Sequence, residues 1–385
     1  MEQKVIYFDH AATSGTKPLS VTEAIIDCLK NTNANPGRSS HLLSIKAAEI
    51  VYHCREAIGE LFNFPETEKV ILTKNATEAL NIALYGTMES ESGGEVLTTS
   101  MEHNSVQRPL NHLKNKGRIK LKIVQGDRNG LITPQKIEAA IGNETRLAAV
   151  TSASNVCGTK LDLAGIYETC RAKGVKLLVD GAQGAGAMKI DLARTPFDLF
   201  AITGHKHLFG PQGTGALIVK DPDALAPFMC GGTGSLSEKA VQPDFPPDKF
   251  EAGTVNTPGL AGLGAGIQFI LDEGIEKIIE REQQLTQYLL QKLREIDEIE
   301  VYAPEAERVA VVSFNMKGAL ASEISYYLDR EWRICARPGL HCAPLAHQTL
   351  GTFPHGTVRF SLSYFNTEKE IDIAIYALKS YARGE

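Results

Sequence analysis

Seven short apolar segments recur between residues 70 and 220, and each is bounded by glycine, proline or polar residues. Two of them, 175–180 and 197–203, are β-branched or aromatic in character, which is typical of strands buried on both faces of a parallel sheet. Amphipathic stretches lie between the seven segments, such as 133–141, where Thr133 can cap a helix and Pro134 suits its first turn. This alternation predicts an α/β fold with a mostly parallel seven-stranded sheet covered by helices. The expected strands are 70–73, 96–100, 119–124, 147–152, 175–180, 197–203 and 215–220.

The chain beyond residue 257 follows a different pattern. An apolar stretch precedes a charged segment whose apolar residues recur at helical spacing, and strands and helices then alternate more loosely. We therefore expect two domains: a large domain over 16–257, and a smaller α+β domain built from 1–15 and 258–385. The elements expected in the second part are helices at 258–271, 272–296, 319–331 and from 367, and strands at 309–314 and 357–362.

Composition and charge narrow the class of protein. A chain of 385 residues with 43% hydrophobic residues can bury a large core and exceeds the usual size of one domain. The formal charge is −6 and the basic residues are scattered, which argues against nucleic acid and anionic membranes as partners. No apolar stretch reaches the roughly 20 residues of a membrane span, and no export signal is visible at the first residues. Seven irregularly spaced cysteines fit a reducing compartment, so we expect a cytoplasmic enzyme.

Asp180 and Lys206 follow two of the expected strands, 175–180 and 197–203. Ligands of open α/β sheets bind beyond the carboxyl ends of the strands, so both side chains should face one crevice. A lysine that forms a Schiff base and an aspartate that keeps a pyridine nitrogen protonated are what pyridoxal 5'-phosphate requires of a protein. For either residue alone, an ordinary surface lysine or strand-end aspartate is the simpler interpretation.

Three segments contain groups that could hold a phosphate. Residues 73–78 follow a strand and open a helix, so their N–H groups and Thr77 could bind an anion, or could form a plain N-cap. Thr203 and His205 flank the candidate lysine closely enough to hydrogen-bond a phosphate above the crevice. The polar segment 249–257 could reach a phosphate or a neighbouring subunit.

His103 and Asn155 lie just beyond two further strands. His103 could stack on a flat ring or shuttle a proton, and a solvent-facing loop histidine is an equal alternative. Asn155 could donate to a ring oxygen or serve as a turn residue. Arg359 lies inside an apolar strand, where burial without an anionic partner would be costly, and a substrate carboxylate could be that partner.

Cys342 lies in a loop beside His341 and five residues after Arg337. A loop cysteine near basic groups can have a lowered pKa and act as a nucleophile, whereas a buried inert thiol is the commoner fate of cysteine. The histidines near this loop match no known zinc spacing, so we expect no metal site.

Several of these segments occur together, and in the same order, in one known family. They are NATEA, MEHN, SNVCGT, VDGAQ, TGHK, FEAGTVNT and RPGLHCAP. On these motifs the chain resembles the cysteine desulfurases and selenocysteine lyases of the class V aminotransferase group, which are pyridoxal phosphate enzymes of fold type I. The short loop around Cys342 resembles the subgroup in which that loop is compact. Pro338 and Leu340 depart from the more usual RTGHHC form of the loop.

The resemblance implies a role for each candidate residue. Lys206 would form the Schiff base, Asp180 would contact the pyridine nitrogen, Gln183 the ring hydroxyl oxygen, and His103 the ring face. Cys342 would accept the sulfur, which makes Lys206, Cys342 and His103 the catalytic set. Phosphate contacts are implied for Ala76, Thr77, Thr203 and His205, with Thr254 from the partner subunit of a homodimer; substrate contacts are expected from Asn155, Arg337 and Arg359.

The resemblance also implies the reaction. L-cysteine would be converted to L-alanine, with its sulfur held on Cys342 as a persulfide and passed to an acceptor protein. L-selenocysteine is an alternative substrate, and transamination by a class V aminotransferase is an alternative reaction. A non-catalytic sulfur-relay protein with the same fold is the alternative from a different class.

Overall fold

The computed structural model describes residues 5–37, 40–91 and 93–384. Its largest sheet has seven strands in the order β2-β8-β7-β6-β5-β3-β4. All neighbours are parallel except β8, which runs antiparallel to both β2 and β7. The sequence-based prediction of a mostly parallel seven-stranded sheet is therefore confirmed. The strands are β2 Val70–Thr73, β3 Glu95–Thr99, β4 Lys120–Val124, β5 Thr145–Thr151, β6 Lys176–Asp180, β7 Leu199–Thr203 and β8 Gly215–Val219.

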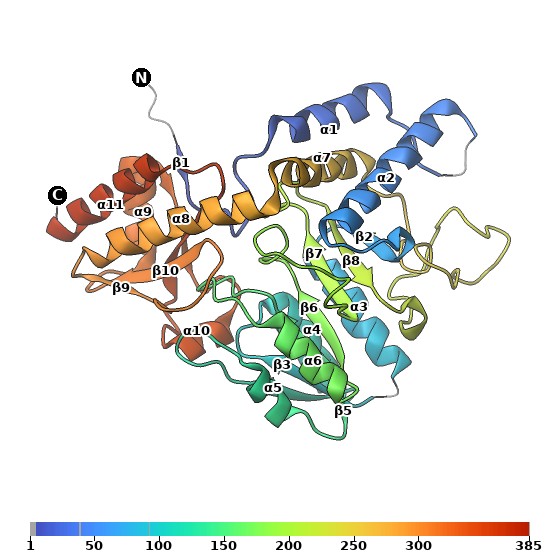
Figure 1. Cartoon of the computed structure of the whole chain (residues 1–385), viewed down its shortest axis with the longest axis horizontal. Coiled ribbons are helices and arrows are strands. Elements are labelled where there is room, and N and C mark those ends of the chain that lie inside the picture. The colour runs from blue at the N-terminus through green and yellow to red at the C-terminus, as the bar shows by residue number, and fades with distance from the viewer. Residues whose placement is uncertain (1–4, 38–39, 92, 385) are drawn as a thin grey trace.

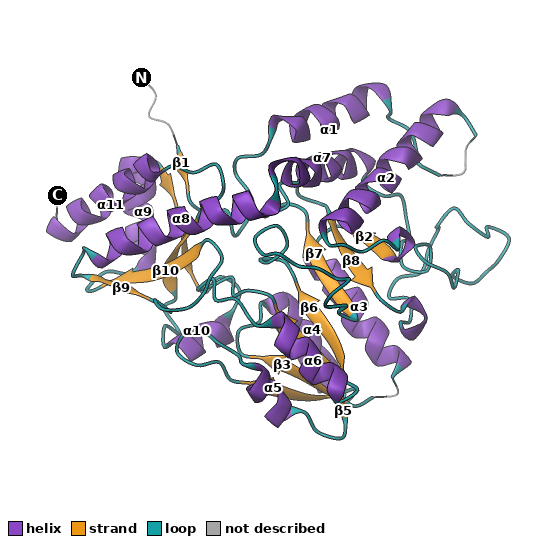
Figure 2. Cartoon of the chain, viewed as in Figure 1, coloured by secondary structure: helices purple, strands orange, loops and turns teal. Residues whose placement is uncertain are grey.

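Helices cover both faces of this sheet (Figures 1 and 2). On β5, Leu147 and Ala149 point into a core with two helices, whereas Ala148 and Val150 point into a separate, larger core. This alternation along the apolar residues 147–150 is the period-two geometry of β structure. The first face carries α3 Ala76–Ser90 and α4 Asn104–Asn115; the second carries α2 Leu42–Leu61, α5 Pro134–Ala140, α6 Leu163–Ala172 and α7 Thr257–Glu273.

A second core lies at the other end of the molecule (Figure 1). It is built on a four-stranded antiparallel sheet in the order β12-β13-β10-β9. The N-terminal strand β1, Ile6–Tyr7, pairs in parallel with β11, Ile334–Cys335, so the start of the chain packs with its C-terminal part. The remaining elements are β9 Ile299–Val301, β10 Val311–Met316, β12 Arg337–Gly339, β13 Thr357–Ser361, α8 Ile275–Arg294, α9 Ala321–Trp332, α10 Pro344–Leu350 and α11 Glu368–Arg383.

Helix α7 lies in the range expected for the smaller domain, yet it packs against α1, Leu19–Asn31, and α2 beside the large sheet. Small residues allow this close approach. A Cβ added at Gly262 would lie 2.8 Å from Ile25 of α1, and one at Gly266 would lie 2.5 Å from the carbonyl oxygen of Leu208. The exact domain boundary stays a prediction. Within the described ranges, no helix has both the length and the apolar character that crossing a membrane requires.

Candidate active site

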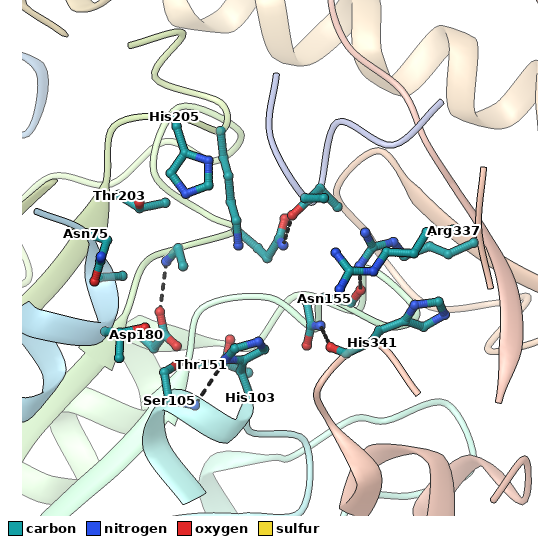
Figure 3. Close-up of a pocket in the computed structure, with 18 residues that line it drawn as sticks. Asn75, His103, Ser105, Thr151, Asn155, Asp180, Thr203, His205, Arg337 and His341 are labelled. Atoms are coloured by element: carbon teal, nitrogen blue, oxygen red, sulfur yellow. Dashed lines mark hydrogen bonds between the residues drawn. The ribbon is translucent and has the colours of Figure 1, made fainter. Parts of the chain in front are cut away.

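The carboxyl ends of β5, β6 and β7, the start of α3 and the strands β12 and β13 enclose one cavity of about 210 Å³ (Figure 3). Ligand sites of open α/β sheets are expected at this edge. Most of the residues selected from the sequence meet here. The cavity is lined by Ala76, Thr77, His103, Asn155, Asp180, Gln183, Thr203, His205, Lys206, Arg337 and Arg359, among others.

Asp180 and Lys206 come from neighbouring strands, as the end of β6 and the turn after β7. Asp180 is buried, and its Oδ1 accepts a hydrogen bond of 2.9 Å from the N–H of Ala182. Burial raises the pKa of Asp180, while the Ala182 N–H and the Lys206 ammonium oppose that rise. Burial also lowers the pKa of Lys206 to about 8, against the effect of the Asp180 carboxylate. A substantial share of the Lys206 amine is therefore neutral near pH 8 and able to act as a nucleophile or base.

Several buried polar atoms around the cavity have no hydrogen-bond partner among the described residues. These are Thr203 Oγ1, His205 Nδ1 and Gln183 Oε1. Buried polar groups are normally satisfied, so such a cluster marks the place of a polar ligand. At the start of α3, Asn75 caps the helix through its side chain at 2.9 Å from Glu78 N, and the first-turn N–H groups of Ala76 and Thr77 have no intrahelical partner. The Thr203 hydroxyl, the start of α3 and His205, whose pKa burial lowers to about 4, suit a phosphate group.

Pyridoxal phosphate fits this set of residues. Its phosphate would be held by the α3 start with Thr203 and His205, and its ring nitrogen would face the Asp180 carboxylate. Lys206, with its lowered pKa, is the amine that would carry its aldehyde carbon. Gln183 donates a hydrogen bond of 3.0 Å from Nε2 to Ala11 O. Its Oε1 has no partner among the described residues and is available to accept a hydrogen bond from a ligand.

His103 is held as the cap of α4. Its Nδ1 accepts the N–H of Ser105 at 3.0 Å and lies 2.8 Å from the Ser105 hydroxyl (Figure 3). Because a backbone N–H can only donate, Nδ1 is the accepting nitrogen and Nε2 carries the proton in the neutral ring. Burial lowers the pKa of His103 to about 4, and the cations Lys206, Arg337 and Arg359 act in the same direction. The ring is thus neutral at pH 7, with an N–H donor.

Arg359 is buried in β13 and already has an anionic partner inside the chain, which sequence analysis did not identify. Its guanidinium donates to Asp9 Oδ1 at 2.7 Å and to Asn155 O at 3.0 Å. Burial lowers the pKa of Arg359, and the Asp9 carboxylate opposes that effect. The Nε atom of Arg359 has no partner among the described residues. Arg337 lies directly opposite Arg359 on β12, so two guanidinium groups meet at this wall of the cavity.

Cys342 and Thr254 are the two selected residues that do not line the cavity. Cys342 is exposed in an adjoining hollow of about 480 Å³, which shares Thr77, His103 and Ser105 with the cavity. A negative charge on Cys342 would raise the pKa of the Arg359 guanidinium. Thr254 is exposed and lines a different cavity of about 160 Å³. Among the described residues, no group of three or more histidine, cysteine or acidic side chains could hold a metal ion.

Four further residues complete the site and were missed. Thr151 ends β5 beside Asp180, and Ser105 follows His103, so the strand-end argument could have included both. Asp9 reaches the site from the N-terminal part of the chain, and no local pattern marks it, whereas His341 was noted only as a neighbour of Cys342.

Comparisons with known proteins agree with this geometry. Residues 6–373 match the family model "Aminotransferase class-V". A probable cysteine desulfurase of Methanothermobacter thermautotrophicus is 35% identical over 98% of this chain and 94% of that protein. The cysteine desulfurase of Cronobacter sakazakii is 32% identical over 98% of this chain and 93% of its own length. The apo structure of the cysteine desulfurase of Thermococcus onnurineus NA1 superposes with a TM-score of 0.93 and 31% identity, covering 99% of this chain and 95% of that one.

Proposed function

Because this chain belongs to the aminotransferase class-V family, we propose that it is a pyridoxal phosphate-dependent cysteine desulfurase that forms L-alanine from L-cysteine and collects the sulfur on Cys342. The observation that carries this proposal is the pairing of two sites. A cavity with Lys206, Asp180 and unpartnered phosphate-type donors adjoins a hollow that contains an exposed cysteine, and His103 borders both. The named relatives cover nearly the whole chain and support the same reaction.

The cofactor, when bound, supplies an electron-withdrawing ring that stabilises negative charge at the substrate Cα. Asp180 would hold the ring nitrogen in its protonated form, which its buried carboxylate favours electrostatically. Lys206, whose pKa is about 8, would take the Cα proton as a general base. Arg359 Nε and Arg337 are the cationic donors available for the substrate carboxylate.

Sulfur transfer would take place at the border between cavity and hollow. The Cys342 sulfur forms a bond to the substrate sulfur while the bond from that sulfur to Cβ breaks. The electron pair of the broken bond stays with Cβ, which takes up a proton, so that alanine and a Cys342 persulfide result. His103, neutral and protonated at Nε2, can donate a hydrogen bond to the reacting sulfur.

We extend the proposal to partners and location. A homodimer would allow the exposed Thr254 of one subunit to reach the phosphate site of the other, and exposed Leu19, Leu42 and Tyr52 offer apolar surface for such an interface. A sulfur-acceptor protein would collect the sulfur in the open hollow beside Cys342. Free cysteines throughout the described chain are consistent with a cytoplasmic location.

The test is mass analysis of the purified holoenzyme after incubation with L-cysteine. We expect the peptide containing Cys342 to gain the mass of one sulfur atom and free alanine to appear. An unmodified Cys342 peptide, together with amino exchange between alanine and a keto acid, would instead support the aminotransferase reaction. L-selenocysteine in a parallel incubation compares the two proposed substrates.

Uptake of the cofactor should show an unusual dependence on pH. Only the neutral amine attacks an aldehyde, and the pKa of Lys206 in the cofactor-free protein is about 8. We expect the rate of pyridoxal phosphate incorporation, followed by absorbance, to rise with pH and to reach half its maximum near pH 8. Nα-acetyl-lysine, whose side-chain amine has a pKa of about 10.4, is the reference amine. A protein rate that follows the reference curve would contradict a desolvated Lys206.

A further inference from the structure

The turn that contains Cys342 has an unusual backbone. His341 and Cys342 are consecutive non-glycine residues with φ angles of 48° and 57°. L-amino acids rarely adopt this left-handed region, and such residues persist only where surrounding contacts fix them, often at functional sites. The question is which contacts hold this turn.

Two backbone carbonyls of the turn are held from outside. His341 O accepts a hydrogen bond of 2.6 Å from Asn155 Nδ2 (Figure 3), and Cys342 O accepts one of 2.8 Å from the N–H of Asn104. Asn155 and Asn104 follow β5 and β3 of the large sheet, whereas the turn belongs to the C-terminal part of the chain. The turn is therefore fixed relative to the cavity and not only to its own strand.

The buried ring of His341 adds a third attachment through a directed chain of hydrogen bonds. Ser313 Oγ donates to Val156 O at 2.6 Å, and Thr357 Oγ1 donates to Ser313 Oγ at 3.0 Å. Thr357 has thereby used its hydroxyl proton, so at 3.0 Å from His341 Nε2 it can only accept. The imidazole must carry its proton on Nε2.

These contacts form one hydrogen-bond network that links the turn to the large sheet by two routes. One route runs from the His341 carbonyl to the side chain of Asn155, and the other from the His341 ring through Thr357 and Ser313 to the carbonyl of Val156. The two routes end on the consecutive residues Asn155 and Val156. Arg359 also donates a hydrogen bond to the backbone carbonyl of Asn155. The Cys342 turn and the candidate carboxylate-binding arginine are thus anchored on the same two residues, Asn155 and Val156.

We propose that His341 is a positioning residue for sulfur transfer: its ring, as the Nε2–H form donating to Thr357, holds the left-handed turn that presents Cys342 toward the cavity. The inference rests on the proposed function for the role of Cys342. Burial lowers the pKa of His341 well below its usual value, and the facing cations Arg359 and Arg337, with His347, act in the same direction. The His341 ring therefore stays neutral, as its place in the hydrogen-bond network requires.

The test compares matched variants at both ends of the ring contact. Thr357→Val removes the acceptor at nearly constant volume, and Thr357→Ser restores it. His341→Gln places an amide donor near the Nε2 position, and His341→Asn places one near Nδ1 instead. Thr87→Val is the control, because Thr87 is also buried and donates to a helix carbonyl, Ala83 O, away from the turn.

Two measurements are made on each variant: amide hydrogen exchange of residues 340–343 in the cofactor-free protein, and the single-turnover rate of sulfur gain at Cys342 in the holoenzyme. For Thr357→Val and His341→Asn we expect faster exchange and a sulfur-gain rate about 10- to 100-fold lower, since small misplacements of reacting atoms cost this much. The absorbance change on substrate binding should stay as in the wild type. Thr357→Ser and Thr87→Val should behave like the wild type in both measurements, and His341→Gln should lose less than His341→Asn.

Wild-type exchange and sulfur gain in Thr357→Val would overturn the inference, as would equal losses in Thr87→Val or equal behaviour of His341→Gln and His341→Asn. These outcomes differ from failure of the proposed function, in which the wild-type protein itself gains no sulfur on Cys342. The exchange measurement needs neither cofactor nor substrate, so it tests the anchoring in either case.

Discussion

Lys206→Ala will abolish both the visible absorbance band of the covalently held cofactor and the release of alanine from cysteine. Lys206 is the amine of the cavity whose pKa burial lowers to about 8, and it faces the buried Asp180. The proposed function uses the same nitrogen to hold the cofactor and to move the Cα proton, so one substitution removes both. General base catalysis alone contributes about 10²–10⁴-fold, and we expect a loss of at least that size. Absorbance spectra and alanine formation are the measurements.

Two further variants separate this role from electrostatics and folding. Lys206→Arg keeps a positive charge near Asp180 but offers no neutral nitrogen at accessible pH, so it should lose activity like the alanine variant. Lys189→Ala removes an exposed lysine that pairs with Glu276 and should retain both band and activity. A surviving band in Lys206→Ala would place the covalent attachment on another lysine.

The sheet could be predicted because its signal is local. Each strand of the large sheet is a short apolar run closed by glycine, proline or polar residues, and the observed ends differ from the predicted ones by at most two residues. The packing partner of α7 was not predictable in this way. The glycines of α7 allow another helix to pack closely against it. The sequence of α7 does not indicate which residue packs there, and in the structure it is Ile25 of α1.

The same distinction holds for the site. Asp180, Thr203 and Lys206 could be grouped from the sequence because the ends of neighbouring parallel strands meet at one edge. Asp9 contacts Arg359 across 350 residues of sequence, because a parallel bridge pairs Asp9 with Ser361 of β13. That contact also changes the interpretation of Arg359. We expected its anionic partner to be a substrate carboxylate, whereas the folded chain supplies one of its own and leaves Nε without a partner among the described residues.

Cys342→Ser is expected to stop sulfur transfer while leaving the cofactor chemistry intact. The serine hydroxyl is similar in size and cannot form a persulfide, so the rate of sulfide release from cysteine with added reductant should fall by at least about 100-fold. The cofactor band and its change on substrate binding should persist, because Cys342 lines the adjoining hollow and not the cavity itself. Sulfide and alanine are measured together with the spectra.

Cys230→Ser is the matched control for this substitution. Cys230 and Cys342 are the exposed cysteines among the described residues, but Cys230 lies in the loop after β8, outside the lining of both the cavity and the hollow. Its serine variant should release sulfide at the wild-type rate. The comparison also tests the aminotransferase alternative, because transamination would need the cavity residues but no thiol. Equal and full sulfide release by both variants would show that sulfur leaves the substrate without Cys342, and the persulfide mechanism would then be wrong even though Lys206 and Asp180 kept their roles.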